Sequence, residues 1–203
     1  MKAARAPVPR EPNAVLRESR ESADLIREFF ESEATRITTC ARALAARFQE
    51  GGRLYTMGNG GSYSDAQHVA VEFQHPILEK RKALPAQALG AEGAFLTAVG
   101  NDTDFARVFV EALEVHARPQ DAAIGISTSG TATNVIHALR YARDRGLLTI
   151  GFAGRDGGAV ADVAEMPFVV PSWSIHRIQE AHTVLLHVLW DQVHLALGED
   201  DVL

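Results

Sequence analysis

The sequence predicts an α/β fold, with a doubly wound sheet of five parallel strands and helices on both faces. Short apolar runs alternate with segments of helical periodicity, which is typical of parallel strands joined by right-handed helical crossovers. Two of these runs lead into loops rich in glycine and hydroxyl side chains, around 58–65 and 127–134, and each loop precedes a predicted helix. A chain of 203 residues is long enough for one such core and short for two.

The N-terminal part divides into a tail and a long helical segment. Residues 1–14 hold basic residues and three prolines but no apolar run, so we expect a loose tail rather than a secretory signal or a membrane span. Over 15–50, apolar residues recur near the helical period. A helix of that length is unusual in a globular domain. We therefore expect either a break near Ser32 or packing against another subunit, with Gly51 closing the helix.

The α/β core is expected over 53–197, and its strands at 53–57, 84–89, 122–126, 147–153 and 166–170. The third strand is apolar throughout, which places it at the centre of the sheet. Between the strands we expect helices ending at 73, over 91–99, 105–115 and 133–145, and ending at 164, with Gly100-Asn101-Asp102 separating the second from the third. The charged segment 79–82 is predicted to be a solvated connector, with contact to substrate as the alternative.

The last helix is expected over 174–197. Its apolar residues cover much of its circumference, which predicts burial on most sides and contact with a second subunit. It also carries His182, His187 and His194, and histidines on a buried helix are more often core residues than ligands. Together these elements give a flavodoxin-like arrangement.

Residues 57–73 combine the end of a strand, a glycine-rich turn and the start of a helix. Three glycines let the backbone turn tightly and approach a ligand: Gly58, Gly60 and Gly61. Three polar residues behind them are good N-caps: Ser62, Ser64 and Asp65. A helix N-terminus offers unpaired N–H groups and a partial positive charge, so this turn favours an anion such as phosphate. The nucleotide P-loop and the dinucleotide fingerprint are excluded, because neither pattern is met.

His68 and Glu72 follow on the same helix, four residues apart and therefore on one face. An anion cradle followed by this pair suggests a site that holds a phosphorylated substrate and moves protons on it. The structural alternative is that the glycines serve packing alone and that the pair is a solvated surface contact.

A second hydroxyl-rich loop, over 127–134, ends the third strand just before a helix. Its hydroxyls and the helix N–H groups again face an anion, and the alternative is an N-cap with spare serines. In doubly wound sheets, ligands bind outside the carboxyl ends of the strands. Two such loops after two strands of one sheet therefore strengthen the prediction of a binding site.

The composition narrows the function classes. The formal net charge is −6 and no Lys/Arg-dense patch is present, which argues against nucleic acid as the main partner. No segment approaches the roughly 20 apolar residues of a membrane helix. Cys40 is the single cysteine, so no disulfide forms within the chain, and this fits a reducing cytoplasm.

Six ordered motifs together resemble the sugar isomerase (SIS) domain family and, within it, the phosphoheptose isomerases. The motifs are Gly58-Asn59-Gly60-Gly61-Ser62, Asp65-Ala66-Gln67-His68 with Glu72, Gly100-Asn101-Asp102, Gly125-Ile126-Ser127-Thr128-Ser129-Gly130, Gly154-Arg155-Asp156-Gly157-Gly158, and Arg177-Ile178-Gln179-Glu180-Ala181-His182 with His187. The resemblance covers about residues 15–197.

The resemblance implies a fold, an activity and a set of site residues. Such enzymes convert sedoheptulose 7-phosphate to D-glycero-D-manno-heptose 7-phosphate through an enediol, as homotetramers with active sites between subunits, and several bind zinc. By resemblance, one zinc per subunit is expected. The implied metal ligands are His68, Glu72, Gln179 and His187, and the implied acid/base pair is Glu72 with His187. The implied substrate and phosphate contacts are Asn59, Gly60, Gly61, Ser62, Asn101, Asp102, Ser127, Thr128, Ser129 and Gln179.

One geometric difficulty concerns the implied metal site. Gln179 and His187 lie eight residues apart, so roughly 12 Å of helix rise separates their backbones. They reach one metal only if their side chains converge across two turns or if subunits share the site.

The chain also departs from the family pattern. Thr131-Ala132 stands where Asn-Ser is usual, Pro76 stands where an arginine is usual, and His176 stands where the family is often acidic or small. These departures leave the exact phosphosugar open. The alternatives are an isomerase of a different phosphosugar, a non-catalytic binding protein of the replication-initiator-associating type, and a regulatory phosphosugar sensor.

Overall fold

The computed structural model describes residues 12–77 and 81–201. Its centre is a parallel sheet in the order β2-β1-β3-β4-β5. The strands are β1 (Leu54–Gly58), β2 (Ala86–Ala88), β3 (Ala122–Ser127), β4 (Leu148–Gly154) and β5 (Met166–Val170). This is the flavodoxin-type order, and it confirms the predicted doubly wound sheet with the third strand at its centre.

Neighbouring strands β1 and β3 bring the two polar loops together. Their register pairs Leu54 with Ala122 at one end and Gly58 with Ile126 at the other, so both strands end at the same edge. The chain leaves β1 toward β2 on one side and leaves β3 toward β4 on the other. This reversal is the topological switch point at which doubly wound sheets bind ligands.

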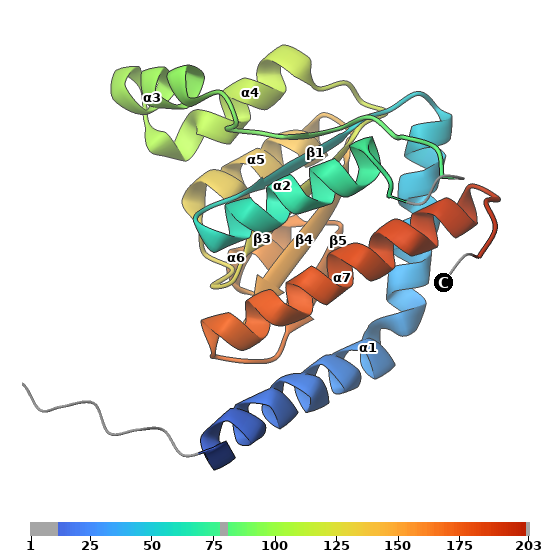
Figure 1. Cartoon of the computed structure of the whole chain (residues 1–203). Helices are drawn as coiled ribbons and strands as arrows, with labels where there is room; N and C mark the ends of the chain where they lie inside the picture. Colours follow the sequence, from blue (N-terminus) through green and yellow to red (C-terminus); the bar gives the residue numbers. More distant parts are fainter. Residues whose placement is uncertain (1–11, 78–80, 202–203) are drawn as a thin grey trace, which may run out of the picture.

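Helices cover both faces of the sheet (Figure 1). One face carries α1 (Pro12–Gln49), α2 (Gly61–Gln74) and α7 (Ile175–Ala196). The other carries α3 (Gly93–Asp102), the short 3-10 helix η1 (Phe105–Arg107), α4 (Val108–His116), α5 (Thr133–Asp144) and α6 (Gly158–Val163). Successive strand residues alternate between the two cores: Leu54 belongs to the core on the side of α1, α2 and α7, whereas Tyr55 belongs to the core on the side of α3 to α6. None of the described helices combines the length and apolarity needed to cross a bilayer.

Helix α1 is continuous, so the expected break near Ser32 does not occur. Figure 1 shows instead that the helix bends midway. The Ser32 hydroxyl donates to the Phe29 carbonyl at 2.9 Å, and such local bonds often accompany bends. The helix begins at Pro12, three residues before the expected start, and residues 1–11 of the expected tail lie outside the described part. Its first half lies along α7, where the Ser22 hydroxyl donates to Glu180 at 2.6 Å.

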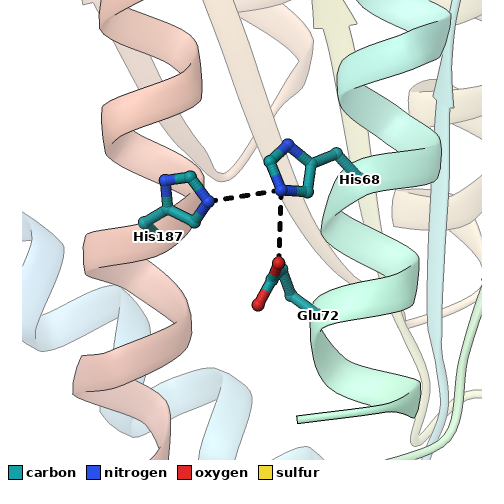
Figure 2. Close-up of side chains that lie close together, drawn as sticks. All are labelled: His68, Glu72 and His187. Atoms are coloured by element: carbon teal, nitrogen blue, oxygen red, sulfur yellow. Dashed lines mark hydrogen bonds and ion pairs between the residues drawn. The ribbon is translucent and has the colours of Figure 1, made fainter. Parts of the chain in front are cut away.

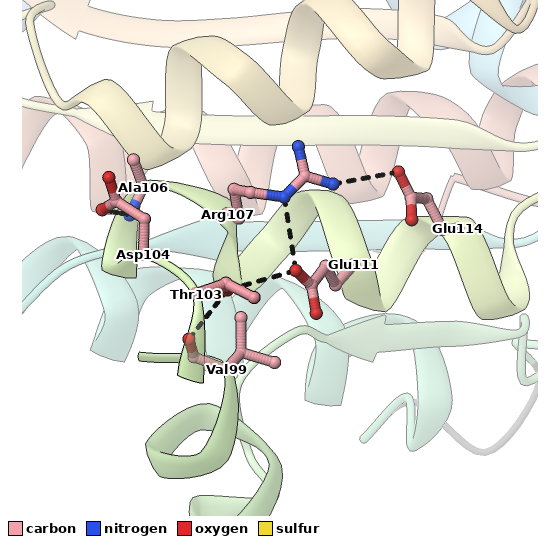
Figure 3. Close-up of polar contacts among 7 residues, drawn as sticks. All are labelled: Val99, Thr103, Asp104, Ala106, Arg107, Glu111 and Glu114. Carbon is pink, nitrogen blue, oxygen red and sulfur yellow. Dashed lines mark hydrogen bonds and ion pairs between the residues drawn. The ribbon is translucent and has the colours of Figure 1, made fainter. Parts of the chain in front are cut away.

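The segment after β2 differs from prediction. Strand β2, one of the two edge strands, is three residues long rather than six, and it pairs with β1 alone. Gly100-Asn101-Asp102 forms the last turn of α3 rather than a connection. Asp104 caps η1 by accepting from the Ala106 N–H at 2.8 Å. Arg107 then donates to Glu111 and Glu114, each at 3.3 Å, and so ties η1 to α4 (Figure 3).

The charged segment 79–82 is not simply a solvated connector. Residues 79 and 80 lie outside the described part, but the Arg81 side chain is 1% exposed. Its guanidinium forms an ion pair with Asp191 of α7 at 2.6 Å and lies over the Trp190 ring. A buried guanidinium needs such a partner, and the sequence around residue 81 does not indicate one 110 residues away.

Candidate functional site

The glycine-rich turn opens α2, but none of the predicted capping side chains caps it. Gly60 is the N-cap, with φ of 55°, a backbone conformation that favours glycine. Tyr63 and Ser64 both donate their N–H groups to the Gly60 carbonyl. The N–H groups of Gly61 and Ser62 have no acceptor within the helix. They form one half of the predicted anion cradle.

The Gln179 side chain lies against this turn. A Cβ on Gly61 would overlap with the Gln179 amide, so only glycine allows the approach. Gln179 was expected to bind both metal and substrate. In this structure it lies over the glycine turn, at the helix end that faces an anion.

The second half of the cradle is the loop between β3 and α5. A cavity of about 150 Å³ lies between the two loops, lined by Asn59, Ser62, Ile126, Ser127, Thr128, Ser129 and Ala132. Four of the predicted phosphate-binding side chains, the hydroxyls of residues 62 and 127–129, therefore share one small polar space. Its volume suits a phosphoryl group rather than a whole sugar.

Hydroxyl groups organise this second loop. The Ala132 N–H lies 3.4 Å from the Ser127 hydroxyl, and the Thr131 N–H donates to the Ser129 hydroxyl at 3.2 Å. Ser129 and Thr131 also share a hydroxyl–hydroxyl bond of 2.8 Å. Ala132, the N-cap of α5, offers no side-chain acceptor. The serines are therefore not spare caps, and Thr131 supplies a hydroxyl close to the position where the family hydroxyl is missing.

Three side chains from two helices converge beyond the cradle, as Figure 2 shows. His68 and Glu72 come from α2, and His187 comes from α7. The Nε2 atom of His68 is 3.2 Å from Glu72 Oε1 and 3.2 Å from Nε2 of His187. The side chain of His68 is 37% exposed and that of Glu72 is 17% exposed, so the cluster is accessible from solvent.

The cluster suits a metal ion. His68 Nε2 carries either one proton or one lone pair, yet it faces a carboxylate oxygen and a second imidazole nitrogen at once. Hydrogen bonding alone can satisfy only part of this arrangement, whereas a cation would accept all three lone pairs. All three ligand atoms lie within 4.8 Å of one another. Tetrahedral zinc, with bonds of about 2.0 Å, places its ligand atoms about 3.3 Å apart.

Asp65 is a further candidate, which the sequence predicted as a cap and as part of a motif but not as a site residue. It lies one turn before His68 on α2, and its Oδ2 is buried without a partner among the described residues. Burial raises the pKa of the Asp65 carboxyl above its usual range, while nearby His68 and a hydrogen bond with Thr183 act in the opposite direction. In the sequence, an aspartate at the start of a helix indicates only a cap.

Other predicted residues lie apart from the cluster. Asn101 and Asp102 are exposed at the end of α3 and hydrogen-bond to each other at 2.7 Å. The carboxamide of Asn59 is paired with that of Asn134. His182 is fully buried and lies 3.1 Å from the Ala153 carbonyl, so it is the core residue that the sequence predicted.

A larger cavity of about 350 Å³ lies at the opposite, amino-terminal edge of β1, lined in part by Arg53, Tyr55, Arg118 and Asp121. The Asp121 carboxylate there accepts the backbone N–H groups of Arg53 and Arg118 and so closes a turn. Size alone would favour this cavity as the substrate-binding site. The chemistry favours the smaller cavity, which lies between the N-terminus of α2 and the hydroxyls of the β3–α5 loop, because α2 also carries His68 and Glu72 of the candidate metal cluster.

Comparisons with known proteins agree with this geometry. A family model described as the SIS domain matches residues 19–154. The phosphoheptose isomerase of Aquifex aeolicus is 44% identical over 174 residues, which is 86% of this chain and 91% of that protein. The phosphoheptose isomerase of Roseiflexus sp. is 41% identical over 186 residues, or 92% and 94% of the two chains. The structure of the phosphoheptose isomerase GmhA from Neisseria gonorrhoeae superposes with a TM-score of 0.83 at 33% identity, covering 89% of this chain and 97% of the other.

Proposed function

The chain belongs to the SIS domain family, and we propose that it is an aldose–ketose isomerase that converts sedoheptulose 7-phosphate to D-glycero-D-manno-heptose 7-phosphate. The observation that carries the proposal is the arrangement on α2. This helix presents an anion cradle at its first turn and His68 with Glu72 two to three turns further along. A phosphate at one end of a substrate and a reacting carbon at the other would both meet this helix.

The cradle would hold the phosphate. The Gly61 and Ser62 N–H groups, the positive end of the α2 dipole and the hydroxyls of the β3–α5 loop all favour a dianion. Thr131 would contribute in place of the missing family serine. Ser127 and Ser129 each accept a backbone N–H of their own loop, so these hydroxyls are already oriented before a ligand binds.

Glu72 and His187 would move the protons. Isomerisation transfers a proton between adjacent carbons through an enediol, so it needs a base near C1 and C2 and a donor for the oxygens. The Glu72 carboxylate is acceptor-only and partly buried, which suits it to take the proton from one carbon and return it to the other. The His187 imidazole, which lies on the facing helix beside His68, would exchange a proton with the substrate oxygen.

The metal-binding part of the proposal rests on the cluster of His68, Glu72 and His187. These three side chains would hold zinc, and Gln179 remains the candidate fourth ligand. When bound, zinc supplies a Lewis acid that polarises a carbonyl. His68, which lies between the other two side chains, would serve as a metal ligand.

We further propose a homotetramer with active sites at subunit interfaces. Several large apolar side chains are exposed in the single chain, among them Leu16 of α1, Val71 of α2, and Trp173 and Ile175 near the start of α7. Val71 lies next to Glu72 in sequence, so a subunit packed on this face of α2 would border the site.

A direct assay tests the function. Purified protein of known metal content and known mass is supplied with sedoheptulose 7-phosphate, and NMR follows the aldoheptose product. We expect Glu72→Gln and His187→Ala to keep the assembled mass, four times the 22.0 kDa of one chain, but to lose about 100-fold or more in kcat. Glu114→Gln on α4, far from the cluster in sequence and on the other face of the sheet, is the matched control with unchanged activity.

Two outcomes would contradict the proposal. If both variants keep full activity on every phosphosugar that the parent accepts, the acid/base roles are wrong. If the folded, zinc-supplied parent turns over no phosphosugar, the non-catalytic binding protein becomes the better assignment, and capture of a replication initiator would support it.

A further inference from the structure

We propose that Asn59 and Asn134 form a clamp that sets the spacing between the two loops of the phosphate cradle. Asn59 belongs to the glycine-rich turn before α2, and Asn134 belongs to the first turn of α5. On this proposal Asn134 is a positioning residue, and Asn59, which also lines the cavity, sets the spacing through the same pair. The inference rests on the proposed function only in taking the bound anion to be a sugar phosphate.

The pair is closed by two reciprocal hydrogen bonds. Asn59 Nδ2 donates to Asn134 Oδ1 at 2.9 Å, and Asn134 Nδ2 donates to Asn59 Oδ1 at 2.9 Å. Asn134 is only 3% exposed, and its Oδ1 also accepts the Val135 N–H at 2.9 Å. A buried carboxamide with this many partners has one orientation, so it presents a fixed donor and acceptor to Asn59.

The β3–α5 loop is independently anchored on its other side. The Val160 N–H donates to the Gly130 carbonyl at 3.0 Å, and a Cβ on Gly130 would overlap with the Gly157 backbone. This loop is therefore fixed against the turn that follows β4. Gln179 contacts the glycine-rich turn from α7, and among the described residues the Asn59–Asn134 pair supplies the side-chain hydrogen bonds that join this turn to the start of α5.

The consequence is a defined gap for the anion. Asn59 directly precedes the Gly60 cap, and the free N–H groups of α2 follow it, so a shift of Asn59 moves those donors. The hydroxyls lie on the opposite wall of the same 150 Å³ cavity. Loss of the clamp should therefore weaken phosphate binding while leaving the acid/base cluster, which lies further along α2 and on α7, in place.

The test is a double-mutant cycle with two readouts. We prepare Asn59→Ala, Asn134→Leu and the double variant, and measure KM and kcat for sedoheptulose 7-phosphate and the Kd of inorganic phosphate by phosphorus NMR titration. Each single variant is expected to raise KM and the phosphate Kd by about tenfold, with kcat within about twofold of the parent. The double variant should have a KM and a phosphate Kd no higher than those of the weaker-binding single variant, because each single change already breaks the whole pair.

Asn59 is exposed, so its variant remains informative if the buried Asn134→Leu variant fails to fold. Thr149→Val is the matched control. Thr149 is fully buried on β4, and its hydroxyl accepts the Glu165 N–H in a hydrogen bond of 3.0 Å that is not part of the cradle. It should lower the Tm without changing either phosphate readout.

Four results would overturn the clamp, three from the variants and one from the parent. The first is an unchanged phosphate Kd in Asn59→Ala. The second is a phosphate Kd that rises about 100-fold in the double variant, which would mean that the two single effects multiply. The third is a loss of activity in the variants that is confined to kcat. A parent that binds no phosphate at millimolar concentration also overturns it. If the parent fails to isomerise sedoheptulose 7-phosphate but the phosphate Kd responds as expected, the proposed function fails and the clamp stands.

Discussion

His182 is a residue whose protonation should couple folding to pH. It is fully buried between α7 and β4, against the Phe152 ring, and its Nδ1 has no partner among the described residues. Burial lowers the pKa of His182 from 6.5 to about 4, and the bond to the Ala153 carbonyl offsets this only in part. The neutral imidazole therefore donates its Nε2 proton to that carbonyl in the folded protein.

The sign of the effect follows from proton uptake. Between pH 6.5 and about 4, His182 is protonated in the unfolded chain but not in the folded chain. The stability that goes with the neutral side chain is therefore fully present above pH 6.5 and is lost as the pH falls toward 4. We expect His182 to remove about 2 kcal/mol of stability between pH 6.5 and pH 5. His182→Gln, which keeps a donor but does not titrate, should flatten the Tm–pH curve over this range. Parallel curves for the two proteins would contradict the assignment.

At the residue scale, the sequence predicted local pairs better than distant ones. The spacing of His68 and Glu72 placed both on one helix face without further information. His187 was predicted to belong to the same site only through the family resemblance, because no local sequence pattern indicates which face of α7 contacts α2. Asn134 was not predicted for the same reason, since its partner Asn59 lies 75 residues away. The loop before α5 also offered more conspicuous hydroxyl residues.

At the element scale, the ends of all five strands were predicted to within two residues, with the largest difference at β2. Strand β5 was located at its observed bounds, β3 differs by one residue at one end, and β1 and β4 differ by one residue at both ends, because buried parallel strands are short apolar runs. Edge strand β2 has few partners and is shorter than its apolar run. The predicted cap of α2 was wrong. The N-cap is Gly60, whose positive φ favours glycine, and the polar side chains that follow it make no capping hydrogen bond.

The connection between α2 and β2 depends on a buried ion pair. Arg81 donates to the Asp191 carboxylate at 2.6 Å and to its backbone carbonyl at 3.2 Å, so it attaches this connection to α7. Removing one partner of a buried pair leaves an uncompensated charge, which costs about 3–5 kcal/mol. We expect Arg81→Met to lower the Tm strongly and Arg81→Met/Asp191→Leu to recover much of the loss. Arg27→Ala, which breaks exposed pairs on α1, should cost less than about 1 kcal/mol.

Calorimetry at fixed protein concentration compares these variants. A double variant as unstable as Arg81→Met would show that the guanidinium acts through its packing on Trp190 and not through the ion pair. Because the same connection follows Glu72 by only nine residues, activity measured on the folded double variant also reports whether the attachment matters to the site.

At the scale of the whole molecule, the distance between cradle and cluster selects the length of the substrate. Ser62 in the cradle is six residues from His68 and ten from Glu72, which corresponds to about 9 and about 15 Å along α2. An extended chain spans about 1.2 Å per bond. The eight bonds from C1 to phosphorus in a seven-carbon 7-phosphate therefore reach about 10 Å, whereas the four bonds of a three-carbon ketose phosphate reach about 5 Å.

We therefore expect kcat/KM to fall in the order seven-, six- and three-carbon ketose phosphates, each phosphorylated on its terminal carbon. The three-carbon substrate should lose about 100-fold or more, because a phosphate held in the cradle leaves its reacting carbons short of the level of His68 along α2, which the seven-carbon substrate reaches. Coupled assays on one preparation give the series, and unphosphorylated sedoheptulose separates the effect of length from that of the phosphate. A higher kcat/KM for the six-carbon than for the seven-carbon substrate would indicate that the altered residues Pro76 and Ala132 adapt the site to a shorter sugar. Equal kcat/KM values across the series would show that the cradle and the cluster do not bind the two ends of one substrate.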